Sequence, residues 1–200
     1  MLGAQDAHHE ASGAFTGEVS LPMLEDCGVE WVLVGHSERR HVIGESNDIV
    51  REKLHAALNA GFSVILCTGE LKEEREAGRQ LEVNRAQLAH ALDGLPAAAL
   101  SRLVIAYEPV WAIGTGLTAT PEDAQEVHAD LRAALAEHYD QSVADAVRIQ
   151  YGGSVKPANA AELFAKPDVD GFLVGGASLK SADFLDIINA VTAAKAEGQA

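Results

Sequence analysis

Cysteine and long apolar runs are both scarce in this 200-residue chain. Cys27 and Cys67 are far apart and form no C-x-x-C pair, so the sequence indicates neither a disulfide framework nor a zinc site. No stretch reaches the roughly 18 consecutive apolar residues that span a membrane. Residues 1–6 lack the charged and apolar regions of a signal peptide. Together these absences predict a cytoplasmic protein with reduced thiols.

Positive charge is scarce as well. The chain has 15 Lys and Arg against 30 Asp and Glu, a formal net charge of -15. This negative net charge argues against nucleic acid or an anionic membrane as a partner, because it repels anionic molecules at long range. Any phosphate site must therefore act locally, through backbone N–H groups and helix N-termini.

Short apolar segments recur along the whole chain and have the length and composition of buried strands. They span residues 2–5, 31–34, 64–67, 103–107, 147–151 and 171–174. Amphipathic segments between them predict helices. We expect these at 22–26, from 47 to about 60, 72–92, 121–138 and 158–164, and from Ser181 to a frayed tail at 195–200.

Six strand-then-helix units in alternation predict an α/β fold with a parallel sheet. An open doubly wound sheet and a closed barrel both satisfy this pattern. A complete eightfold (β/α) barrel takes about 250 residues, so six units resemble a TIM-type barrel with two units absent, incomplete or open. No repeat, linker or low-complexity segment divides the chain, so residues 1–200 are expected to form a single (β/α) domain.

Polar or glycine-rich turns follow five of the six predicted strands, and in a parallel sheet these ends lie together. Glu108 directly follows 103–107, and Pro109 favours an extended backbone there. Apolar residues and a Gly-Thr-Gly hinge come next, which predicts a lid that desolvates this carboxylate and makes it a candidate base. A structural ion pair is the alternative role. The lid would comprise Pro109, Val110, Trp111, Ala112, Ile113, Gly114, Thr115 and Gly116.

His36 also follows a strand directly, and it would either polarise a substrate carbonyl or be an ordinary structural histidine. Ser37 beside it lacks the G-x-S-x-G pattern of a hydrolase nucleophile. Turns at 152–154 and 175–176 end the last two strands, where barrels often bind phosphate through backbone N–H groups. Tight turns that need glycine are the alternative explanation.

Taken in order, these motifs resemble the triosephosphate isomerase family over essentially the whole chain. The matching stretches are GAFTGE at 13–18, GHSERR at 35–40, YEPVWAIGTG at 107–116, YGGSV at 151–155 and GFLVGGASL at 171–179. The resemblance implies a (β/α) barrel that interconverts dihydroxyacetone phosphate and glyceraldehyde 3-phosphate, without metal or cofactor. A small phosphorylated triose would be its substrate, and neither nucleic acid nor membrane its partner.

The resemblance also implies roles for individual residues. Glu108 would move a proton between adjacent carbons while His36, as a neutral imidazole, polarises the carbonyl; this family is a standard worked example of that pairing. Phosphate-binding and wall residues would be Gly114, Ser154, Gly175, Gly176 and Leu173. Supporting residues would be Ser37, Glu38 and Cys67.

The sequence departs from the family pattern at its beginning, because the family's first two βα units and their Asn-x-Lys strand have no counterpart here. Glu38, which neighbours that lysine in the family, is then expected to be an unpaired buried charge or to take up a proton. Activity is expected to be impaired, and a phosphate-binding barrel remnant or oligomeric scaffold is the alternative function. A third hypothesis, nucleotide or phosphosugar binding by an open sheet, has little support because no predicted strand is followed by G-x-G-x-x-G.

Association between copies is a further expectation. Unpaired edge strands favour it, and in the family the loop at 7–20 inserts into a neighbouring subunit. The resemblance therefore assigns oligomer contacts to Thr16, Glu18 and Arg39.

Overall fold

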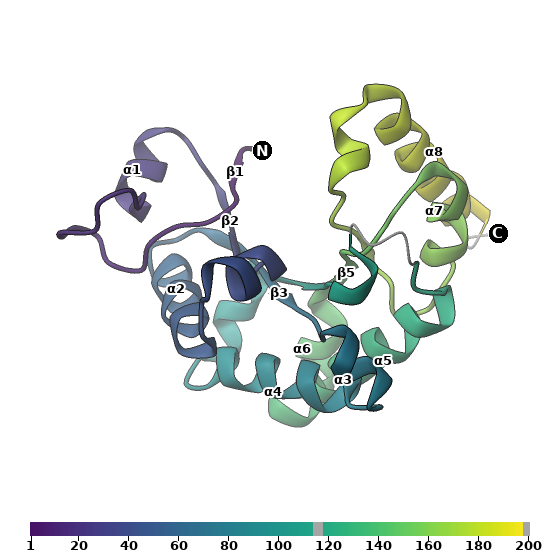
Figure 1. Ribbon diagram of the computed structural model, residues 1–200, viewed down its shortest axis with the longest axis horizontal. Helices are drawn as coiled ribbons and strands as arrows, with labels where there is room; N and C mark the ends of the chain where they lie inside the picture. The colour runs from purple at the N-terminus through teal and green to yellow at the C-terminus, as the bar shows by residue number, and fades with distance from the viewer. Residues whose placement is uncertain (114–117, 198–200) are drawn as a thin grey trace.

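The computed structural model describes residues 1–113 and 118–197, and six parallel strands form a single sheet within them (Figure 1). Each strand pairs with the next strand in sequence. The strands are β1 (Gly3–Ala4), β2 (Trp31–Val34), β3 (Ser63–Thr68), β4 (Leu103–Tyr107), β5 (Arg148–Tyr151) and β6 (Gly171–Phe172). All six predicted strands are thus confirmed, with small differences at their ends.

Helices follow the strands and lie outside the curved sheet (Figure 1). They are α1 (Leu21–Asp26), α2 (Asn47–Asn59), α3 (Lys72–Glu76), α4 (Gln80–Leu92), α5 (Pro121–His138), α6 (Gln141–Ala146), α7 (Pro157–Phe164) and α8 (Ser181–Glu197). Short turns of other helix types are a π-helix at Arg39–Ile43 and 3₁₀ turns at Ala97–Arg102, Val110–Ala112 and Gly176–Leu179.

Strand order decides between the two architectures that the sequence left open. A doubly wound sheet reverses its strand order at a switch point, whereas here the order runs without reversal from β1 to β6. Among the described residues, β1 and β6 each pair on one side only. The fold is therefore an incomplete, open barrel of the TIM type, as predicted.

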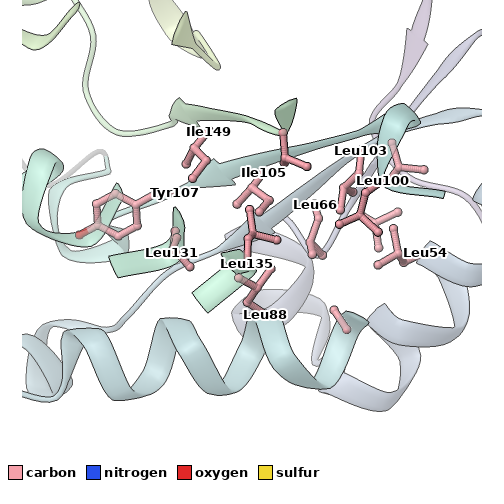
Figure 2. Packing of buried hydrophobic residues seen from close by; sticks show 14 of the residues in the cluster. Leu54, Leu66, Leu88, Leu100, Leu103, Ile105, Tyr107, Leu131, Leu135 and Ile149 are labelled. Atoms are coloured by element: carbon pink, nitrogen blue, oxygen red, sulfur yellow. The ribbon is translucent and has the colours of Figure 1, made fainter. Parts of the chain in front are cut away.

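The main core lies between the sheet and the outer helices. Figure 2 shows Leu66, Ile105 and Ile149 of neighbouring strands packed toward Leu88 of α4 and Leu135 of α5. Leucines at positions 88 and 135 and the two isoleucines are at most 2% exposed. The apolar composition of the strands predicts burial on both faces, but only β4 is buried at every position. On β2 the side chains alternate between buried and half-buried, because the open barrel leaves its inner face partly accessible.

Three helix predictions were wrong in detail. The long helix predicted at 72–92 is two helices, because Gly78 adopts a left-handed φ of 68° between them. Helical spacing with Leu131 and Leu135 predicts that His138 belongs to the buried stripe of α5, but it is exposed, and His128 is buried instead. On α8, helical spacing predicts that four apolar residues face inward, namely Phe184, Leu185, Ile188 and Val191. Ile187 is buried instead, and those four are exposed by 38–56% or half-buried, because nothing in the described chain covers that side.

Part of the predicted frayed tail is helical. Residues 195–197 still belong to α8, and residues 198–200 lie outside the described part of the chain. Across the residues that the structure covers, no helix has the length and apolar character needed to cross a membrane.

His128 is a completely buried titratable group of the core. Its Nδ1 lies 3.0 Å from the carbonyl oxygen of Asp168 and donates to it, while its Nε2 has no hydrogen-bond partner in the described structure. Burial lowers the pKa of His128 to about 4, although the carbonyl of Asp168 and the charge of Asp170 act in the opposite direction. Folding therefore holds this imidazole neutral at pH values where the unfolded chain would protonate it.

We expect the protein to lose stability as the pH falls from about 6.5 toward 4, by up to about 3 kcal/mol from His128 alone. The unfolded state binds the proton in this window and the folded state does not, so acidification favours unfolding. Urea denaturation at pH 7 and pH 4.5 measures the effect. His128→Gln should remove this part of the pH dependence, whereas His138→Gln, on the exposed side of the same helix, should leave it unchanged. Equal pH dependence in both variants would contradict the assignment.

Candidate active site

The carboxyl ends of the strands surround a cavity of about 300 Å³. It is lined by residues that follow β1, β2, β4, β5 and β6, together with one residue of the predicted lid and one residue of β2. The lining comprises Gln5, Leu33, His36, Glu38, Glu108, Ile113, Gly152, Gly153, Ser154, Val155, Leu173, Val174, Gly175 and Gly176. The site predicted from separate motifs is therefore a single cavity.

Glu108 and His36 are in direct contact in this cavity. The Nε2 of His36 lies 3.0 Å from Oε1 of Glu108. Ser37 donates its backbone N–H to Oε2 of the same carboxylate at 3.0 Å, and its hydroxyl lies 3.5 Å from Oε1. Only 2% of Glu108 is exposed, against 28% of the His36 side chain. The predicted acid–base pair is thus assembled by two strands that are not neighbours, β2 and β4.

The hydrogen bonds around His36 define which ring nitrogen carries the proton. Glu38 donates its backbone N–H to Nδ1 of His36 at 3.3 Å, so Nδ1 acts as an acceptor. The proton then lies on Nε2, which faces the Glu108 carboxylate. A neutral imidazole in this tautomer donates a hydrogen bond into the cavity.

Opposing effects act on the Glu108 carboxylate. Burial raises its pKa above the ordinary value, while His36, the Ser37 N–H, the Cys67 thiol and Arg40 all lower it. Cys67 is fully buried at the end of β3, and burial followed by the charge of Glu108 raises the pKa of its thiol well above the usual range. The thiol is therefore a protonated hydrogen-bond donor to Glu108. A buried carboxylate with a raised pKa is suited to accept a proton near neutral pH.

Four of the predicted phosphate-binding and wall residues line the same cavity. Ser154, Leu173, Gly175 and Gly176 all line it, on the turns that follow β5 and β6. Gly114, predicted to join them, lies outside the described residues, as do Thr115 and Gly116 of the lid. Two glycine turns therefore border the same space as the Glu108 carboxylate.

The described part of the lid is anchored to a buried carboxylate that sequence reasoning missed. Glu70 follows β3, is completely buried, and accepts hydrogen bonds from the Trp111 indole at 2.7 Å and the Tyr107 hydroxyl at 2.9 Å. Asn84 of α4 donates to its other oxygen at 3.0 Å. In the sequence Glu70 stands in a polar turn after a strand and nothing marks it as buried. Its three hydrogen-bond donors belong to segments that are distant along the chain.

The structure contradicts the expectation for Glu38. We predicted a buried charge without a partner or with a bound proton, but Glu38 is exposed at the edge of the cavity. Solvent stabilises its carboxylate directly, so no compensating cation is required.

The residues assigned to oligomer contacts belong to the segments that follow β1 and β2. Thr16 and Glu18 belong to an exposed loop. Arg39 pairs within its own chain, with Asp6 at 2.9 Å and Glu45 at 2.6 Å, and Glu18 acts on it electrostatically. An intermolecular role for these residues stays a prediction.

Lys53 forms a buried ion-pair network that the sequence did not predict. Its side chain is 4% exposed and its ammonium lies 2.8 Å from Asp6 and 2.6 Å from Glu45. Burial raises the pKa of Asp6 despite Lys53. Burial acts the same way on Glu45, but hydrogen bonds from Lys53 and Arg39 outweigh it and hold the pKa of Glu45 below its usual value. Residue spacing carries no signal for this network, which joins β1, α2 and the turn after β2.

Metal ligation has no support in the described residues. Over residues 1–113 and 118–197, no three His, Cys, Asp or Glu side chains are grouped so that they could hold an ion.

Fold and site together define a class of protein, the parallel (β/α)-barrel enzymes whose acid–base groups lie at the carboxyl ends of the strands. The triosephosphate isomerase family model matches residues 1–191. Triosephosphate isomerase of Herpetosiphon aurantiacus is 57% identical over 187 residues, which are 94% of this chain and 75% of that protein. The Taenia solium enzyme is 56% identical over 190 residues, 94% of this chain and 76% of its own length. The chain belongs to the triosephosphate isomerase family.

Proposed function

We propose that this chain interconverts dihydroxyacetone phosphate and D-glyceraldehyde 3-phosphate, a reaction of glycolysis and gluconeogenesis. The observation that carries the proposal is the contact between Glu108 and His36 in a cavity bordered by two glycine turns. Family membership and relatives of the same name support it.

The geometry supports a proton-transfer mechanism through an enediolate. Substrate would bind with its carbonyl oxygen at His36 Nε2–H, replacing Glu108 as the acceptor. The Glu108 carboxylate would then remove a proton from the carbon next to the carbonyl. The imidazole would stabilise the charge that develops on oxygen, and its Nε2 would pass a proton to the former carbonyl oxygen and take one from the neighbouring hydroxyl. Glu108 would return its proton to the neighbouring carbon, so that the hydroxyl carbon becomes the new carbonyl. Closing the lid, of which Ile113 lines the cavity, would keep water from the enediolate.

A phosphate group would be held locally. The turns at Ser154 and at Gly175 and Gly176 bring the backbone close to the cavity without bulky side chains. Among the described lining residues there is no Lys or Arg. Since a cation that stabilises charge in such a site is typically worth about 10²–10³ in rate, we propose that turnover by this chain is impaired.

The same lack of a cationic lining residue favours a second candidate function, phosphate-ligand binding without turnover by a non-catalytic barrel or oligomeric scaffold. The two candidates are separated by adding glyceraldehyde 3-phosphate in deuterated water to the purified chain. Product formation with deuterium at the transferred position is the expected result. Binding of inorganic phosphate without turnover or deuterium exchange would instead support the second function.

We further propose that the protein is a cytoplasmic homo-oligomer built on a single domain over residues 1–200. The exposed loop at 10–19 supports association, because Phe15 and Val19 on it are 42% and 44% exposed. Exposed apolar residues near the ends of the sheet, Leu2 and Leu179, add to this tendency. Light scattering of the purified chain tests the proposal, and a stable monomer at all concentrations would refute it.

A further inference from the structure

Arg40 has an unusual set of partners for a guanidinium in this acidic chain. It is half-buried in the π-helix at Arg39–Ile43, and all of its hydrogen bonds go to neutral oxygens. It donates to the carbonyl of Gly35 at 2.7 Å, the carbonyl of Cys67 at 3.1 Å and the side-chain oxygen of Asn47 at 2.7 Å. Within the described residues no carboxylate lies within 4.0 Å of it. Its charge is therefore not neutralised by direct contact.

These partners connect the elements that carry the reacting groups. Gly35 immediately precedes His36, and Cys67 contacts the Glu108 carboxylate. The backbone N–H of Arg40 also donates to the carbonyl of His36 at 3.0 Å. Arg40 thus donates hydrogen bonds to two carbonyls of the His36 turn, those of Gly35 and His36. It also connects that turn to the end of β3 through the carbonyl of Cys67.

Close packing at Gly35 makes this arrangement specific. Gly35 has a left-handed φ of 74°, and a Cβ atom built there would lie 2.9 Å from the Arg40 guanidinium. Any other residue would therefore push the guanidinium away or strain the backbone. The turn is shaped to receive the Arg40 side chain.

We propose, on the basis of the function above, that Arg40 is a positioning residue that sets the His36–Glu108 geometry and stabilises the Glu108 carboxylate with a positive charge that makes no ion pair in the described structure. The charged and titratable groups that face Glu108 are His36 from the turn after β2, Cys67 from β3 and Arg40. Burial lowers the pKa of Arg40, yet a guanidinium stays charged at every physiological pH. Arg40 is thus a permanent charge in this group, whereas His36 and Cys67 donate as neutral groups.

Two variants separate charge from geometry. Arg40→Gln removes the charge and keeps a donor for the Gly35 carbonyl, while Arg40→Lys keeps the charge and loses the three-way hydrogen bonding. Arg102→Gln is a matched control, because Arg102 also donates to a backbone carbonyl, that of Leu58 at 2.8 Å, but it precedes β4 at the opposite end of the sheet.

The measurements are the Glu108 titration, followed by carboxyl ¹³C NMR and assigned with Glu108→Gln, and the pH profile of isomerisation. With Arg40→Gln we expect the Glu108 midpoint to rise by about one pH unit and kcat to fall about tenfold or more. Arg40→Lys should titrate like the unaltered chain while kcat stays reduced. Arg102→Gln should change neither quantity.

A Glu108 midpoint in Arg40→Gln that matches Arg102→Gln would overturn the proposal. Because the titration requires no turnover, it decides the role of Arg40 even if the unaltered chain proves inactive, an outcome that would refute the proposed function alone. Urea midpoints of the three variants show whether each remains folded, and Arg40→Lys with a raised Glu108 midpoint would also overturn the charge role.

Discussion

Replacing Glu108 with glutamine should slow isomerisation by about 10³–10⁴-fold, the upper part of the range for a general base. The amide has nearly the shape of the carboxylate, so its oxygen can still accept the Ser37 N–H. It cannot accept a proton from carbon. Steady-state rates with glyceraldehyde 3-phosphate measure the effect.

Glu38 provides a control for the loss of a negative charge beside the same cavity. It also lines the cavity but is exposed and makes no side-chain contact with His36. We expect Glu38→Gln to retain most of the activity. A Glu108→Gln chain with more than about a tenth of the original rate would contradict the role of Glu108 as the base.

Replacing Lys53 with methionine should lower the free energy of unfolding by about 3–5 kcal/mol. Lys53 is the ammonium between the carboxylates of Asp6 and Glu45. Without it, two largely buried negative charges face each other with only the Arg39 guanidinium to compensate. Urea denaturation at pH 7 measures the loss.

The loss from Lys53→Met should diminish as the pH falls, because protonating the two carboxylates removes the uncompensated charge. Adding Glu45→Gln to the variant should recover part of the stability for the same reason. Lys72→Met provides a surface control: its pair with Glu76 spans 3.6 Å and both side chains are more than half exposed, so it should have little effect. A Lys53→Met chain as stable as this control would show that the buried network is not stabilising.

Sequence reasoning predicted which residues meet at the strand ends because local pattern and global arrangement coincide in a parallel sheet. Every apolar run that precedes Glu108, His36 or a glycine turn is a strand, and parallel strands place their carboxyl ends together. No contact had to be known in advance to expect these residues in the same cavity. The cavity that they line confirms that expectation.

Contacts between distant elements followed no such rule. Glu70 with its three donors, Lys53 with its two carboxylates and Arg40 with its neutral oxygens each join segments whose separation in sequence has no fixed period. Their side chains look like ordinary surface charges until the barrel's curvature brings the segments together. The break at Gly78 and the exposed side of α8 were missed for a related reason, since hydrophobic periodicity records a preference for burial but not whether a neighbour covers the helix.

The sequence by itself determined where the strands lie along the chain, that they are parallel and which residues follow their ends, because strands and their turns are encoded by adjacent residues. Their order within the sheet, which separates an open barrel from a doubly wound sheet, came from the tertiary structure. Only the tertiary structure decided which buried charges are compensated, that Glu38 is solvated, and that His128 is held neutral in the core. Those outcomes depend on burial and on distances between elements. Electrostatic free energies in proteins vary with both, and neither is written in a local pattern.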